Sequence, residues 1–133
     1  MTIIFAKFNQ TAAEQAMNWK YVLTVQSQKA RTPLSPFFGR ARWLMAVAND
    51  GRGLQMIPNR DLTARFVVDQ IIRLTPQTVI CGYIDPKSAA LLLKAGIDLR
   101  LGPCSVPASE LIQSAVTLPI PPFAGLAVPG RRS

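Results

Sequence analysis

The stretch WLMAVANDGRGLQMIPN (residues 43–59) decides the fold of this chain. An apolar run is followed by the turn signal NDG and then by a second, mixed run. Asn, Asp and Gly tolerate the backbone conformations of tight turns, so this pattern is typical of a β-hairpin. We therefore predict two antiparallel strands over 43–48 and 54–57, with Pro58 and Asn59 ending the second strand.

The segments on either side of the hairpin have different periods. Upstream, YVLTV (21–25) is rich in β-branched and apolar residues and predicts a strand, which a polar, proline-bearing loop separates from the hairpin. Downstream, apolar residues recur at helical spacing from Leu62 to Leu74. This periodicity predicts a helix over 62–74, which Pro76 is expected to end.

The second half of the chain alternates between strand and helix patterns. TVIC (78–81) is a short apolar run of the kind buried in a parallel sheet. Asp85 is a good N-cap before Pro86, and the helix that follows is expected to end at Gly96. The last two predicted elements are a strand over 97–101 and a helix that starts at Ser105 or Pro107 and runs through Ala115.

Three strands with local connections, followed by alternating helix and strand, predict an α/β domain with a mixed sheet. We expect an N-terminal extension (1–19), one domain (20–117) and an irregular tail rich in proline and glycine (118–133). The extension fits this plan poorly. Either Met17 is an alternative start, or residues 2–8 add an edge strand.

The composition restricts the function classes. The 133 residues include 49% hydrophobic residues and carry a net charge of +8, which is typical of a globular protein with an anionic partner. The absence of histidine excludes Ser-His and Cys-His catalysis and imidazole ligation of zinc. The sequence shows no clear signal peptide and no apolar run of the roughly 18–20 residues that span a bilayer. We expect a cytoplasmic protein without a membrane partner.

The loop SPFFGRARW (35–43) is the first candidate site. In an extended segment Arg40 and Arg42 would point to the same side, and two guanidiniums suit a planar or multiply charged anion. Gly39 would let the backbone approach a ligand closely. No catalytic group accompanies the arginines, so the loop favours binding over chemistry. The alternative is that both are solvated surface arginines beside a strand.

The two cysteines form the second candidate site. Cys81, followed by Gly82, ends one predicted strand, and Cys104 follows the end of the last one, each ahead of a helix. Ligands of open α/β sheets bind at such strand ends, and a helix N-terminus lowers a thiol pKa. Two thiolates would suit a soft metal. Since they cannot complete a tetrahedral site, such a metal would bring its own sulfides or share a second chain. The alternative is that each cysteine is a small buried hydrophobe.

Taken in order, these motifs resemble those of the dinitrogenase iron–molybdenum cofactor biosynthesis family. The similar segments span roughly residues 20–116. They are the strand Tyr21–Ser27, the loop Ser35–Ala41, the hairpin end Ile57–Asn59, and the block Val79–Ile84 with Ala89, Leu92 and Ala95–Ile97 after it.

The resemblance implies a ribonuclease H-like, three-layer α/β/α fold whose mixed five-stranded sheet has one antiparallel hairpin strand. It also implies binding of iron–sulfur or molybdenum-containing clusters during their assembly. The family commonly has histidine directly before the Phe-Gly of its loop, where this chain has Phe37. Histidine ligation at that loop is therefore excluded.

Three hypotheses follow. The first is a non-enzymatic carrier of an anionic iron–sulfur or iron–molybdenum cofactor or precursor, with nitrogenase or cofactor-assembly proteins as partners. The second is a basic module that binds nucleic acid or an acidic protein without a cofactor; we expect nucleic acid less than the cluster. An enzyme is the third and weakest reading, because no acid/base constellation can be assembled. The expected cofactor-binding residues are Phe38, Gly39, Arg40, Arg42, Cys81, Gly82 and Cys104, of which Cys81 and Cys104 would ligate metal.

Overall fold

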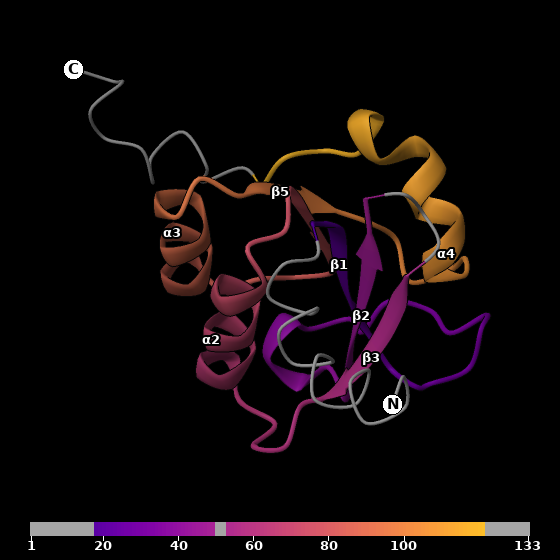
Figure 1. Cartoon of the computed structure of the whole chain (residues 1–133), viewed down its shortest axis with the longest axis horizontal. Helices are drawn as coiled ribbons and strands as arrows, with labels where there is room; N and C mark the ends of the chain where they lie inside the picture. Colours follow the sequence, from indigo (N-terminus) through magenta and orange to yellow (C-terminus); the bar gives the residue numbers. More distant parts are fainter. Residues whose placement is uncertain (1–17, 50–52, 122–133) are drawn as a thin grey trace, which may run out of the picture.

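The computed structural model describes residues 18–49 and 53–121, and their strands form one five-stranded mixed sheet (Figure 1). The strand order is β3-β2-β1-β4-β5. Strand β2 is antiparallel to both β1 and β3, whereas β4 is parallel to β1 and to β5. The sequence prediction of an α/β fold with a mixed sheet is confirmed. The strands are β1 (Trp19–Val25), β2 (Trp43–Ala48), β3 (Leu54–Pro58), β4 (Thr78–Cys81) and β5 (Asp98–Leu101).

Two of the described helices, α2 (Ala64–Leu74) and α3 (Pro86–Lys94), begin at N-cap side chains that the sequence supplies. The Thr63 hydroxyl accepts a hydrogen bond from the Phe66 N–H at the start of α2, and the Asp85 carboxylate accepts one from the Ser88 N–H at the start of α3. The α-helices are α2 (Ala64–Leu74), α3 (Pro86–Lys94) and α4 (Ala108–Leu111), and the 3₁₀ helices are η1 (Phe38–Arg40) and η2 (Ile112–Thr117).

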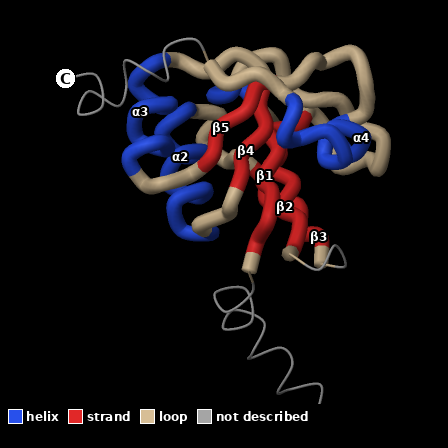
Figure 2. The backbone as a smooth tube through the Cα atoms, turned by 90° about the horizontal axis from the view of Figure 1, so that it is seen from above, coloured by secondary structure: helices blue, strands red, loops and turns tan. Residues whose placement is uncertain are grey.

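Alternation along the strands places apolar side chains on both faces of the sheet. In β1, Val22 belongs to a core cluster with α2 and α3, whereas Leu23 and Val25 belong to a second cluster with α4 and η2. Figure 2 shows the strands side by side, with α2 and α3 on one side of the sheet and α4 on the other. Both faces of the sheet are therefore covered by helices.

Several element ends differ from the sequence prediction. Strand β1 already begins at Trp19, which is buried in the first cluster. Helix α2 begins at Ala64 and not at Leu62, because Thr63 is its N-cap, whereas its end at Leu74 is the predicted one; there Thr75 takes a left-handed conformation (φ 46°) and donates its N–H to the Ile71 carbonyl. The last helix tightens to 3₁₀ from Ile112 onward.

Both termini lie partly outside the described residues, and so do the alternatives for Met17 and for residues 2–8. Part of the predicted tail is ordered against the sheet, since the Leu101 N–H donates to the Pro119 carbonyl at 2.8 Å. None of the described helices combines the length and the hydropathy needed to cross a membrane.

The parallel strands β1, β4 and β5 end at one edge of the sheet, which we call the carboxyl edge. Helix α3 follows β4 at this edge, and the segment 35–42, which we call the arginine loop, lies there as well, paired with the residues that follow β4. Ligands of open α/β sheets bind outside such an edge. The fold thus brings the arginine loop to the place where a binding site is expected.

Candidate functional site

The arginine loop is held to the end of β4 by two backbone hydrogen bonds. The Phe38 N–H donates to the Tyr83 carbonyl at 2.7 Å, and the Tyr83 N–H donates to the Pro36 carbonyl at 2.8 Å. Gly82 permits this approach, because a Cβ at that position would lie only 2.5 Å from the Ser35 carbonyl oxygen. The predicted site residue Gly82 therefore lies beneath the loop and seats it.

Arg40 and Arg42 line one hollow of about 310 Å³ together with Leu62. Arg40 ends the 3₁₀ turn η1 rather than lying in an extended segment, yet both arginines border the same hollow. Both are exposed, and neither forms an ion pair with a carboxylate of the described residues. Their charge is therefore available to a ligand.

Asn59 is a buried polar side chain that links the two segments bordering this hollow, although the sequence pattern indicated it only as a strand end. It is 4% exposed, donates its side-chain N–H to the Ala41 carbonyl at 2.8 Å and accepts from the Leu62 N–H at 3.1 Å. The Asn59 backbone N–H also donates to the Arg42 carbonyl at 3.0 Å. One buried amide thus joins the arginine loop to the turn before α2. The sequence signal was a lone Asn between a strand end and a helix cap.

Gly39, another predicted site residue, packs against the start of α2. A Cβ on Gly39 would lie 3.0 Å from the Ala64 nitrogen and 3.1 Å from its Cβ. The first turn of α2 therefore lies directly beside η1. Since a helix N-terminus carries a partial positive charge, it adds to the field of the two arginines. This part of the carboxyl edge suits an anion.

The two phenylalanines of the loop have opposite surroundings. Phe38 is 1% exposed and belongs to the core cluster on the α2–α3 face. Phe37 is 54% exposed, and its ring meets the Tyr83 ring edge-on, with centroids 6.1 Å apart and planes inclined by 72°. Phe38 was predicted to contact a cofactor, which stays a prediction; the exposed ring at the site is that of Phe37.

The two cysteines are both free thiols in different surroundings. Cys81 is fully buried in the α2–α3 cluster, and this burial raises the pKa of its thiol to about 12. The neighbouring strand β1 buries the Thr24 hydroxyl, which has no hydrogen-bond partner among the described residues. Cys104 is exposed in the loop after β5. The structure does not bring the two thiols to one exposed position.

Within residues 18–49 and 53–121, no group of three His, Cys, Asp or Glu side chains could hold a metal ion. Whether either cysteine ligates a metal stays a prediction. The arrangement that the structure does show is a charged, partly apolar hollow at a sheet edge. It can hold an anion by charge and hydrogen bonding.

Comparison with solved structures identifies the class of protein to which this fold is similar. The apo form of the orange protein from Desulfovibrio gigas matches with a TM-score of 0.64 at 17% identity, over 80% of this chain and 94% of that chain. A Methanococcus jannaschii protein provisionally described as a dinitrogenase matches with a TM-score of 0.52 at 14% identity, over 78% and 93% of the two chains.

A Thermotoga protein of the DUF35 family, provisionally described as a NifB protein, matches with a TM-score of 0.55 at 10% identity, over 74% of this chain and 87% of that chain. No family model matches the sequence, and no curated protein matches it. At these identities the comparisons show a shared α/β fold. Two of these three matched structures have nitrogenase-related names.

Proposed function

We propose that this protein is a non-enzymatic carrier of an anionic iron–sulfur cluster, of the iron–molybdenum cofactor, or of a precursor of either. The observation that carries this proposal is the hollow at the carboxyl edge, which Arg40 and Arg42 line without a carboxylate partner among the described residues. Clusters of this kind have a net negative charge, and arginine is the cation best suited to large, weakly hydrated anions.

The fold gives this proposal its context. The strand order β3-β2-β1-β4-β5, with helices packed on both faces, supports a three-layer α/β/α arrangement of the ribonuclease H-like kind. Solved structures with the same fold include proteins provisionally described as a dinitrogenase and as a NifB protein. This agreement favours nitrogen fixation and cofactor assembly as the setting, nitrogenase or its assembly proteins as partners, and the cytoplasm as the compartment.

The residues at the hollow suggest how a cluster would be held. Guanidinium groups donate hydrogen bonds to sulfide or oxygen atoms at the cluster surface, while Leu62 offers apolar contact. Cys104 is the thiol that such a cluster could reach from solvent, whereas Cys81 would have to leave the core first. A cluster that brings its own sulfide ligands therefore fits the hollow without a change in the fold.

The proposal is tested by anaerobic gel filtration of the protein after incubation with tetrathiomolybdate or with extracted iron–molybdenum cofactor. We expect the visible absorbance and the metal to elute with the protein. The double substitution Arg40→Ala/Arg42→Ala should reduce retention about tenfold or more, since it removes two charge-assisted contacts.

The matched control is Arg73→Ala/Lys94→Ala, which removes the same charge from the last turns of α2 and α3, away from the hollow. This variant should retain the metal as the unmodified protein does. Equal losses in the two variants would indicate diffuse electrostatics, and no retained metal in the unmodified protein would refute the carrier function.

A further inference from the structure

Two aromatic rings project from the carboxyl edge beside the arginine hollow. Phe37 is 54% exposed and Tyr83 is 58% exposed, although the two rings contact each other edge-on. Aromatic rings contribute a large part of the binding free energy at protein interfaces, and adjacent exposed rings mark an interaction surface more often than scattered apolar residues do. The pair is therefore a surface that a partner would cover.

The backbone fixes this pair in place before any partner binds. The residues on either side of Phe37 are paired with Tyr83 through the Phe38 N–H and the Pro36 carbonyl, and the Ser35 hydroxyl donates to the Phe37 carbonyl at 2.9 Å. A prearranged pair of rings loses little conformational entropy on binding. Such a pair can anchor a partner at low entropic cost.

The surroundings of the pair are basic. The Arg40 N–H donates to the Phe37 carbonyl at 3.1 Å, so Arg40 belongs to the same turn as the exposed Phe37 ring. Arg40 and Arg42 are both exposed and form no ion pair within the described residues. Tyrosine and arginine are enriched among the residues that dominate binding energies, and unpaired arginines select an acidic partner.

We propose that the Phe37–Tyr83 pair docks an acidic protein segment that packs an apolar side chain against the exposed surfaces of the two rings. The two rings contact each other edge-on, with planes inclined by 72°, so they form one joined apolar surface for an aliphatic side chain and not two parallel platforms for stacked bases. The role of this partner, to deliver or receive the cargo of the adjacent hollow, rests on the carrier function proposed above. The docking contact itself does not.

The test uses two fluorescein-labelled synthetic peptides of twelve residues, one of Glu and Gly only and the other with Leu in place of three Gly. Fluorescence anisotropy is measured with the full, cargo-free chain at a fixed, near-physiological salt concentration. We expect the Leu peptide to bind about tenfold more tightly than the Glu/Gly peptide. Phe37→Ala/Tyr83→Ala should abolish this difference. Arg40→Ala/Arg42→Ala should instead weaken the binding of both peptides and keep the ratio of their affinities.

The matched control is Leu54→Ala/Val116→Ala, because Leu54 and Val116 are also large and exposed, at 60% and 78%, but lie elsewhere. This variant should keep the tenfold preference. Circular dichroism confirms that all variants are folded, which is expected since the replaced side chains are exposed. A preference that survives Phe37→Ala/Tyr83→Ala overturns the proposal.

Two further outcomes separate this inference from its alternatives and from the carrier function. Ring-dependent binding of a dT₁₂ oligonucleotide that is tighter than that of the Leu peptide would assign the surface to nucleic acid and overturn the proposal. Discrimination between the peptides by a protein that retains no thiomolybdate would support docking and refute only the carrier function. Retention of thiomolybdate by a protein that does not discriminate between the peptides would support the carrier function and refute the docking proposal.

Discussion

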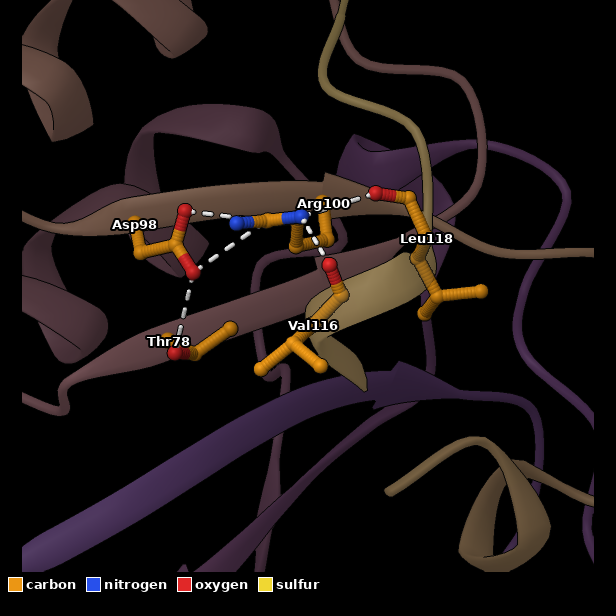
Figure 3. Close-up of polar contacts among 5 residues, drawn as sticks. All are labelled: Thr78, Asp98, Arg100, Val116 and Leu118. Carbon is orange, nitrogen blue, oxygen red and sulfur yellow. Dashed lines mark hydrogen bonds and ion pairs between the residues drawn. The ribbon is translucent and has the colours of Figure 1, made fainter. Parts of the chain in front are cut away.

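Arginine side chains have opposite surroundings in two regions of the molecule. Arg100 is bonded to acceptors of the protein itself, whereas Arg40 and Arg42 are exposed. Arg100 on β5 donates through Nε to both oxygens of Asp98, at 3.0 and 3.2 Å, and through Nη1 to two backbone carbonyls of the C-terminal segment, at 2.9 Å each (Figure 3). Its side chain is only 19% exposed. Arg40 and Arg42 are exposed beside an open hollow. An arginine whose donors are occupied is structural, and one whose donors are free is available for binding.

At the carboxyl edge a different residue links the chain segments in the way that Arg100 does beside β5. There the clamp is the neutral amide of Asn59, which bonds the arginine loop and the turn before α2 from within the core. A neutral clamp leaves the arginine charges unsatisfied. The two regions therefore predict opposite responses of stability and of ligand retention to substitution.

The largest loss of stability is expected for Asn59→Ala. This change leaves the buried Ala41 carbonyl without its side-chain partner and also removes the part-buried bond from the Leu62 N–H, which together should cost about 3 kcal/mol of unfolding free energy. Urea denaturation measures it, and thiomolybdate retention should fall as the hollow loses its shape. The exposed Asn49 provides the control, since Asn49→Ala should cost less than about 0.5 kcal/mol. Equal costs would contradict the role of Asn59 as a clamp.

A smaller loss, of about 2 kcal/mol, is expected for Arg100→Ala. The change removes the bonds to Asp98 and to the carbonyls of Val116 and Leu118, but the Asp98 side chain is 40% exposed, so water replaces part of them. Arg100→Lys should recover only part of the loss, because an ammonium cannot reproduce the planar fork. Thiomolybdate retention should be unchanged in both variants. A loss of retention would break the distinction between the two regions.

The sequence predicted those parts of the fold that depend on neighbouring residues. The hairpin turn, the cap at Asp85 and the apolar periodicity of α2 act over a few residues, and the structure contains the elements they predict. The Asn59 side chain donates to the Ala41 carbonyl at 2.8 Å and to the Gly39 carbonyl at 3.4 Å, across 18 and 20 positions of the chain, so no local pattern could indicate these bonds.

The candidate site was predictable in composition but not in geometry. The sequence singled out Arg40 and Arg42, yet it could not tell which of two adjacent phenylalanines would be exposed, because a 3₁₀ turn replaces the alternation of a strand. It also placed Cys81 correctly at a strand end. The burial of Cys81 depends on which face of β4 carries its side chain and on the helices that cover this face, and these are tertiary features.

The smallest expected effect tests whether water is excluded from the core around Cys81. Burial raises the Cys81 pKa from 9.0 to about 12. Because the folded pKa is the higher one, the stabilisation is complete below pH 9 and is lost as the pH rises toward 12. Between pH 8 and pH 10 the protein should therefore lose about 1 kcal/mol more stability than Cys81→Ala does.

Urea denaturation of both proteins at the two pH values gives this difference, from which the other titrating groups cancel. Cys104→Ala is the matched control, because Cys104 is exposed, and it should lose stability with pH as the unmodified protein does. An identical pH dependence for the unmodified protein and Cys81→Ala would show that water reaches the thiol. The carboxyl edge would then open in solution, and Cys81 would be accessible to a cluster in the hollow.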